Sequence, residues 1–183
     1  GTIAAGVVGV APAVDVTVLS GTTKAYIDGN ADVNALNDIS VSAQASEDTL
    51  MVAFGIAAGV VGVGGAVDVL TIDNTTEAYI GGYADVDAGG DIVVSAVDDT
   101  DVDIISGALA GGLVGVGASV GVLSVTKDTQ AHIDDYADVD AKGAGAGIPG
   151  VLSGTITGGD PAEFGTTAVD GLVVQAESSE DIF

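Results

Sequence analysis

The 183-residue sequence contains no cysteine, no tryptophan and no arginine, and it has a single histidine. Without cysteine there is no disulfide framework, no thiolate metal site and no thiol nucleophile. One histidine is too few for a zinc cluster or for a histidine-based catalytic site repeated along the chain. These absences exclude several common ways of stabilising a secreted domain and of building an active site.

Positive charge is nearly absent as well. Three lysines stand against 27 acidic residues, which gives a formal net charge of −24. Such a chain repels nucleic acid phosphates and anionic lipid head groups, so we expect no nucleic acid partner. An acidic surface favours hydration and a loose attraction of cations, divalent ones especially.

The sequence repeats itself every 53 residues. The copies are Ala25-Tyr26-Ile27, Ala78-Tyr79-Ile80 and Ala131-His132-Ile133, and likewise Ala31-Asp32-Val33, Ala84-Asp85-Val86 and Ala137-Asp138-Val139. A fixed period of this length is typical of stacked arrays, in which each unit buries its apolar face against the next. We expect a single array over residues 1–183, with repeats at about 1–53, 54–106 and 107–183, cut from a longer one.

The repeats have the pattern of strands, although residues 104–125 form an uncharged stretch long enough for a membrane span. The many glycines and valines of this stretch suit a helix poorly, and earlier repeats carry Pro12, Asp15 and Asp68 at equivalent positions. Valine recurs instead at every second position, which is the period of a strand. We therefore expect strands and no membrane insertion.

The alternation defines a valine face and an opposite face that is almost bare of side chains. In the second repeat the valine face consists of Val61, Val63, Val67 and Val69, and the bare face consists of Gly62, Gly64, Ala66 and Asp68. We expect the valine face to point inward, so that Val67→Asp or Val120→Asp unfolds the chain locally by burying an unpaired charge. Two interpretations of the bare strip remain open. A neighbouring sheet or chain covers it, or its small residues only relieve crowding inside a flattened solenoid.

Turn residues divide the second half of each repeat into short strands, with turns at 28–30 and 36–38 in the first copy. A coil of about 20 to 27 residues with three short strands suits a parallel β-solenoid. The predicted fold class is therefore all-β, a parallel β-solenoid or β-helix built from 53-residue repeats with two coils in each repeat. One wide coil per repeat is the alternative.

The third repeat departs from the period after Lys142. If Ile92-Val93-Val94 corresponds to Leu172-Val173-Val174, the offset becomes 80 residues, and 27 residues at about 143–169 have been inserted. The composition of this insertion indicates a loop or side excursion with one short strand at about 151–156. Such insertions lie on one face of a solenoid, where they either make a specific contact with a partner or have no binding role.

Aspartates are the densest polar signal. Asp85 and Asp87, like Asp138 and Asp140, belong to a D-V-D motif that places two carboxylates on the same side of a strand. Stacked at about 4.8 Å, equivalent carboxylates form acidic ladders that sit in water or share calcium. These four residues are our candidate metal ligands. Calcium is the candidate ion, and no cofactor is required.

Paired carboxylates also occur in glycosidases, but catalysis needs unlike environments that split the two pKa values, whereas repetition supplies similar ones. The lack of arginine also disfavours the recognition of acidic sugars. We expect no enzymatic activity and no catalytic residue, with a polysaccharide-binding or polysaccharide-cleaving β-helix as an alternative. His132 reads as a surface variant of Tyr26 and Tyr79. Tyr83 and Tyr136, in turns, read as ordinary exposed residues or as stacking surfaces for sugars.

The stretch G-V-G-G-A-V-D-V-L-T-I-D-N-T-T-E-A-Y-I (62–80) and the stretch A-D-V-D-A-G-G-D-I-V-V-S-A (84–96) resemble units of very large secreted bacterial adhesins. The likeness is to the repeats of filamentous haemagglutinin and of leukotoxin-type filamentous adhesins. It implies a right-handed β-helix shaft, export, and an extracellular or cell-surface location. No catalytic residue is carried over, and the chain is more acidic than such repeats are expected to be.

Together these observations predict a non-enzymatic extracellular segment that forms a rigid rod or fibre on a bacterial cell surface, with a structural or adhesive role. Its partners would be neighbouring copies of the chain, flanking repeats, and surface glycans or host and substrate surfaces. The alternative is a self-assembling subunit of an extracellular filament or matrix fibre. In that case copies would pair through the glycine-alanine strip or through the open ends of the solenoid.

Overall fold

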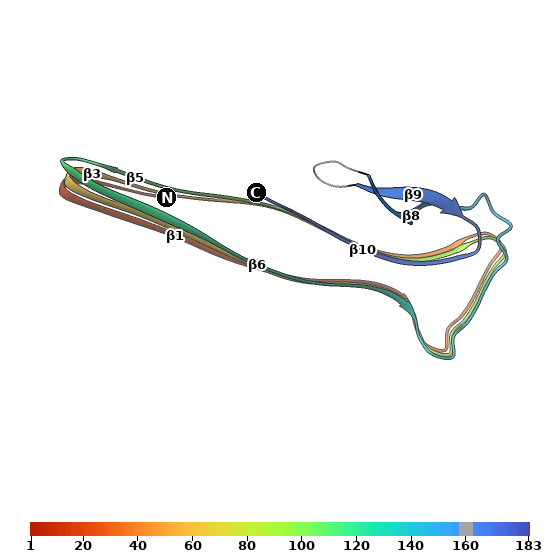
Figure 1. Ribbon diagram of the computed structural model, residues 1–183. Helices are drawn as coiled ribbons and strands as arrows, with labels where there is room; N and C mark the ends of the chain where they lie inside the picture. Colours follow the sequence, from red (N-terminus) through yellow and green to blue (C-terminus); the bar gives the residue numbers. More distant parts are fainter. Residues whose placement is uncertain (158–162) are drawn as a thin grey trace.

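The computed structural model describes residues 1–157 and 163–183, which form strands and turns and contain no α-helix (Figure 1). The ten strands are β1 (Thr2–Ile27), β2 (Asp32–Ala35), β3 (Ile39–Ile80), β4 (Asp85–Ala88), β5 (Ile92–Gly111), β6 (Val114–Ile133), β7 (Asp138–Ala141), β8 (Ile148–Thr157), β9 (Glu163–Val169) and β10 (Leu172–Ile182). The expected all-β class is therefore confirmed.

Parallel pairing joins residues 53 positions apart. In the main sheet β1 pairs with β3, β3 pairs with β5 and β6, and β10 pairs with β5. Tyr26 thus lies beside Tyr79, and Tyr79 beside His132, while β2, β4 and β7 form a small sheet with the same offset. Because the chain returns to a given place once per 53 residues, the prediction of two coils per repeat is wrong. One wide coil per repeat, the alternative, fits the pairing.

The main sheet has two legs that converge toward one end of the molecule (Figure 1). The first leg consists of residues 8–27 of β1, residues 61–80 of β3, and β6. The second leg consists of residues 39–58 of β3, β5 and β10, with residues 2–5 of β1 paired to 55–58. The small sheet of β2, β4 and β7 joins the legs at the wide end, and β2 lies between the predicted turns at 28–30 and 36–38. We call the narrow part the blade, defined as residues 2–16, 51–69 and 104–122.

The size of the inward side chains explains the taper. In the blade the inward residues of β3 include Gly64 and Ala66, and farther from the tip they are Leu70 and Ile72. A Cβ atom on Gly64 would lie only 2.7 Å from the backbone oxygen of Leu109 on the other leg, closer than real Cβ contacts. The legs of the blade therefore touch backbone to backbone, and glycine is required for that approach.

Larger side chains hold the legs apart from the wide edge of the blade onward. Met51, Leu70, Ile72 and Val102 form one buried cluster there. The wide end encloses the main core, which consists of Ile39, Val41, Ala43, Ala78, Ile80, Ala84, Val86, Ala88, Ile92, Val94 and Ala96. Burial of these apolar side chains is the principal stabilising term for the three stacked layers.

The valine face of the blade points outward, contrary to the sequence-based expectation. Val67 lies in the central layer, with Val14 and Val120 as neighbours on either side, and its side chain is still 37% exposed. Ala66 beside it is 1% exposed. Toward the tip the buried inward residues are glycine and alanine, and larger ones such as Met51 and Asp68 lie only at the wide edge of the blade, so the valines stay outside. The glycine-alanine strip is indeed covered, and the cover is the other leg of the same chain.

The insertion forms an antiparallel hairpin of β8 and β9. The short strand expected at 151–156 lies inside β8, whereas β9 was not expected, and residues 158–162 of the predicted excursion lie outside the described residues. After the hairpin, β10 rejoins the main sheet by pairing Leu172 with Ile92, which confirms the predicted offset of 80 residues.

The uncharged stretch 104–125 lies in β5, in β6 and in the bend at 112–113 between them. Within the ranges that the structure covers, no helix is long and apolar enough to cross a membrane.

Candidate functional surfaces

The four predicted metal ligands lie in two adjacent strands at the wide end. Asp85 of β4 pairs in register with Asp138 of β7, and Asp87 pairs with Asp140. Asp32 of β2 extends the first row, so that three carboxylates follow one another along the stack. The structure therefore brings all four candidates together as parallel rows on neighbouring strands.

Like charges and partial desolvation act on this row. Desolvation by neighbouring atoms, followed by the charges of Asp87, Asp32 and Asp138, raises the pKa of Asp85 above its ordinary value. A cation near the row would relieve that repulsion. Calcium prefers six to eight oxygen ligands, however, and among the described residues no three acidic, histidine or cysteine side chains are grouped to hold a metal ion. Calcium binding by these aspartates stays a prediction.

A second acidic row, which the sequence reasoning did not single out, lies on the second leg. Asp48, Asp101 and Asp181 occupy one register position in β3, β5 and β10. Desolvation first, and then the charges of Asp103, Asp181, Asp48 and Asp99, raise the pKa of Asp101. The 53-residue repeat and the predicted 80-residue offset together imply this row, so the sequence did contain the signal for it.

Aromatic rings stack along the layers. The rings of Tyr26 and Tyr79 are 5.1 Å apart and nearly parallel, and the imidazole of His132 follows at 5.3 Å. Tyr83 and Tyr136 stack in the same way at 5.0 Å. The layer spacing sets these distances, and offset stacking of this kind stabilises by about 0.5 to 1.5 kcal/mol per pair.

The backbone at the second aromatic pair is unusual. Tyr83 and Tyr136 have φ angles of 62° and 66°, in the left-handed region that favours glycine and asparagine, and the equivalent residue of the first repeat is Asn30 with φ of 61°. Both tyrosines are mostly exposed, at 64% and 76%. Only their ring edges and outermost faces are free for a ligand, because each inner face covers the other ring.

Lys127 makes a buried ion pair that the sequence reasoning missed. Its Nζ lies 2.6 Å from a carboxylate oxygen of Asp98, and the two side chains are 5% and 0% exposed. The ammonium group also donates hydrogen bonds to the backbone oxygens of Asp98 and Ser179, and the hydroxyl of Thr76 donates to Asp98. Lys127 therefore ties the first leg to two strands of the second. Its role is structural, since its donors are used within the fold.

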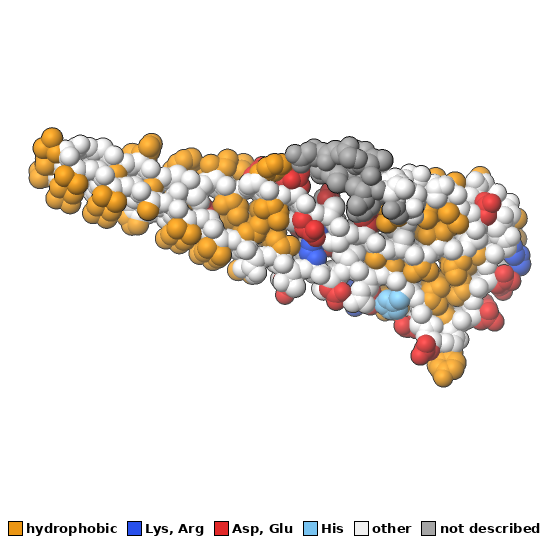
Figure 2. Space-filling model, viewed as in Figure 1, with side chains coloured by type: hydrophobic (Ala, Val, Ile, Leu, Met, Phe, Trp, Pro, Cys, Tyr) orange, Lys and Arg blue, Asp and Glu red, His pale blue; other side chains and the backbone are white. Residues whose placement is uncertain are grey.

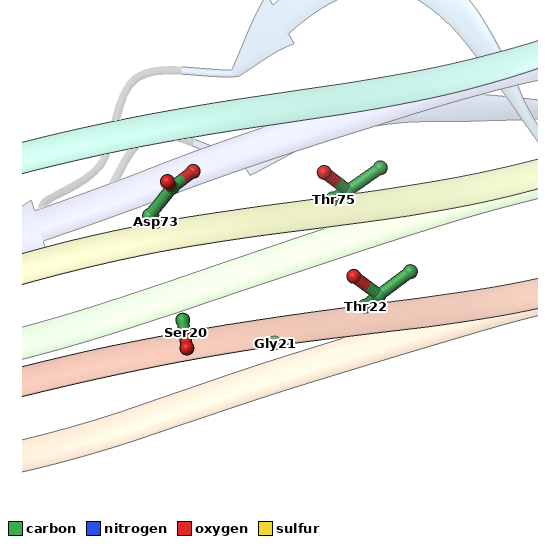
Figure 3. Close-up of a pocket in the computed structure, with 5 residues that line it drawn as sticks. All are labelled: Ser20, Gly21, Thr22, Asp73 and Thr75. Atoms are coloured by element: carbon green, nitrogen blue, oxygen red, sulfur yellow. The ribbon is translucent and has the colours of Figure 1, made fainter.

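A shallow hollow lies on the outer surface of the first leg, lined by Ser20, Gly21, Thr22, Asp73 and Thr75 (Figure 3). Figure 3 shows Asp73 and Thr75 on β3, with Ser20, Gly21 and Thr22 on the neighbouring strand β1. One carboxylate and a few hydroxyls can hydrogen-bond a passing polar molecule. They do not form the nucleophile, base and oxyanion donor that acyl-transfer catalysis needs.

Comparison of the chain with protein-family models, with curated protein sequences and with solved structures found no match.

Proposed function

We propose that this chain is a structural segment of an extracellular β-solenoid, displayed on a bacterial cell surface, with no enzymatic activity. The observation that carries the proposal is the register itself. Tyr26, Tyr79 and His132 lie over one another, as do Asp32, Asp85 and Asp138. A chain that lays equivalent residues over one another in this way can be extended by further repeats, each of which buries its faces against the last.

The dimensions favour a broad ribbon over a thin rod. Residues 61–80 form a leg of 20 residues, or about 66 Å at 3.3 Å per residue, whereas each added layer lengthens the stack by about 4.8 Å. About 14 layers would have to be stacked before the height of the stack equalled the length of one leg. Each layer thus contributes mainly lateral surface, which suits a wall, sheath or display surface.

The acidic surface supports an exposed location. With a net charge of −24 and rows such as Asp48, Asp101 and Asp181 on the outside, the wide part of the molecule is well hydrated and resists association with anionic surfaces. The resemblance to filamentous adhesin repeats agrees with this location. We include in the same proposal the right-handed coil and the adhesive role that this resemblance implies for the chain.

Surface labelling tests the proposal. An antibody raised against the chain should bind intact cells that produce it, and brief treatment of those cells with an external protease should remove the signal. A cytoplasmic protein of the same cells, resistant to that treatment, is the control. Labelling that needs permeabilised cells would contradict the location.

A glycan assay tests the absence of enzymatic activity. The purified chain should release no reducing ends from acidic or neutral polysaccharides, and the double variant Asp85→Asn with Asp138→Asn should behave like the parent. Release that disappears in the double variant would replace a structural role with a catalytic one.

A further inference from the structure

Four columns of valine run across the first leg of the blade, and we call them the valine face. In register, these columns are Val8, Val61 and Val114; Val10, Val63 and Val116; Val14, Val67 and Val120; and Val16, Val69 and Val122. All except the half-buried Val69 are exposed. In the central layer Val63 is 41% exposed although strands flank it on both sides, so the exposure results from the direction of the face and not from the edge of the sheet.

The valine face carries no charge. The only charged residues of the blade are Asp15 and Asp68, and both occupy inward positions, with Asp68 fully buried. Figure 2 shows apolar side chains in rows along the narrow end, while the acidic side chains gather nearer the wide end. A continuous apolar surface of this kind on an otherwise strongly acidic chain marks an interaction site.

The shape of the face is regular. Pro12, Gly65 and Ala118 form a low column between the second and third valine columns. The ridges of valine recur at the layer spacing of about 4.8 Å, and any second copy of the chain offers ridges at the same spacing. Two such faces can interdigitate as two packed sheets do, about 10 Å apart.

The area is large enough for a weak pair. Nine residues along the strand and three layers across it span about 30 Å by 14 Å, or about 420 Å² per face before the relief of the side chains is counted. Two copies therefore bury about 840 Å² or more, which approaches the roughly 1,000 Å² expected of a specific interface. Each further layer adds about 140 Å² to each face.

We infer that the valine face is a self-association surface, on which the blade of one copy packs against the blade of a second copy. Charge sets the arrangement. The acidic wide ends repel one another, so the copies overlap only through their blades, with the wide ends pointing in opposite directions. This inference concerns one surface of the isolated chain and does not depend on the cell-surface location proposed above. It also differs from pairing through the glycine-alanine strip, which the fold itself buries.

Sedimentation velocity on the whole chain tests the inference, at concentrations from about 1 to 100 µM, the range in which weak pairs dissociate. The parent chain should pass from monomer to dimer over this range. The double variant Val63→Glu with Val116→Glu should raise the dimer Kd about tenfold or more, because it buries carboxylates in an apolar interface.

The control is the double variant Val52→Glu with Ile105→Glu. These two residues also pair in register in the blade and are 43% and 49% exposed, but they lie on the second leg. This variant has the same net charge and should dimerise like the parent. Circular dichroism melting curves confirm that each variant is folded before it is compared.

Three results would overturn the inference. The parent could stay monomeric throughout the range, or the second-leg variant could lose the dimer while the valine-face variant keeps it. The parent could also float with neutral phosphatidylcholine vesicles while remaining monomeric without them, which would assign the face to lipid.

Discussion

Ala66 and Val67 are neighbours in β3, and the structure points them to opposite sides of the blade. Replacing each with aspartate therefore tests which face is inside. Ala66 is 1% exposed and packs with Ala13 and Ala53 between the legs. Val67 is 37% exposed and pairs in register with Val14 and Val120.

The two substitutions should differ greatly in their effect on stability. Ala66→Asp places a carboxylate where the legs touch, without a cation beside it, and the penalty for burying such an ion is several kcal/mol. That is a large part of the 5 to 15 kcal/mol typical of a folded domain. Val67→Asp removes only the buried part of the valine side chain, which should lower the free energy of unfolding by about 1 kcal/mol.

Thermal melting followed by circular dichroism distinguishes the variants. At about 2 to 4 °C per kcal/mol for a chain of this size, Val67→Asp should melt within a few degrees of the parent. Ala66→Asp should melt far lower or fail to fold. Measurement in the low micromolar range keeps self-association from adding to the apparent stability. If Val67→Asp unfolds the chain and Ala66→Asp melts like the parent, the valine face is the inner one and the reasoning fails.

Three further predictions concern the ion pair, the acidic row and the blade. Lys127→Met leaves Asp98 buried without its cation and should lower the free energy of unfolding by about 3 to 5 kcal/mol in denaturant titrations, and an unchanged midpoint would contradict the buried pair. Because the pKa of Asp85 is raised in the folded state, the folded chain keeps the carboxyl group of Asp85 protonated to a higher pH than the unfolded chain does. The stability contributed by this protonated carboxyl group is complete below the unfolded pKa and is lost as the pH rises through the folded pKa. Asp85→Asn should therefore raise the Tm at pH 7 but not at pH 3, with a smaller gain at high salt where like charges are screened. An equal gain at both pH values would refute the destabilisation of the ionised carboxylate by desolvation and like charges. Gly64→Val forces a side chain against the backbone of Leu109 and should destabilise by at least about 1 to 3 kcal/mol, whereas equal stability would show that the legs are farther apart than described.

Some of this fold could be read from the sequence. The 53-residue register follows from the repeated A-Y-I and A-D-V motifs, because equivalent residues in a stacked array must lie over one another. The 80-residue offset of β10 follows from the match of Leu172 with Ile92. The turn at 28–30 follows from its Asp, Gly and Asn residues.

The direction of the two faces could not be read in the same way. Alternation shows that Ala66 and Val67 lie on opposite faces, but it does not say which face is covered. The usual assignment of valine to the interior fails because the legs lie too close around Gly64 and Ala66 for a side chain larger than alanine. That closeness is a tertiary property, set by the reversal of the chain at the blade tip. The strand pattern runs through this reversal within β3, and only Gly111-Gly112, at the junction of β5 and β6, marks it in the sequence as a turn.

The candidate surfaces were predicted in part. The rows that contain Asp85 and Asp138 follow directly from the repeat, and the structure places them side by side. The row through Asp181 was missed although the two predicted offsets imply it, whereas the ion pair of Lys127 was missed because it depends on how the second leg packs. Lys127 in particular stands alone in its repeat position, opposite Asn74, and nothing in the sequence marks its partner.

Engineered disulfides test the central claim, the stacking of residues 53 positions apart, most directly, because the chain has no cysteine of its own. Ser46 and Asp99 are both exposed and lie in register on β3 and β5, so Ser46→Cys with Asp99→Cys should oxidise readily to an intramolecular disulfide. Ser46→Cys with Asp73→Cys, 27 positions apart as two coils per repeat would require, should stay reduced, because these residues lie on different legs. A disulfide in the second pair and none in the first would contradict the account.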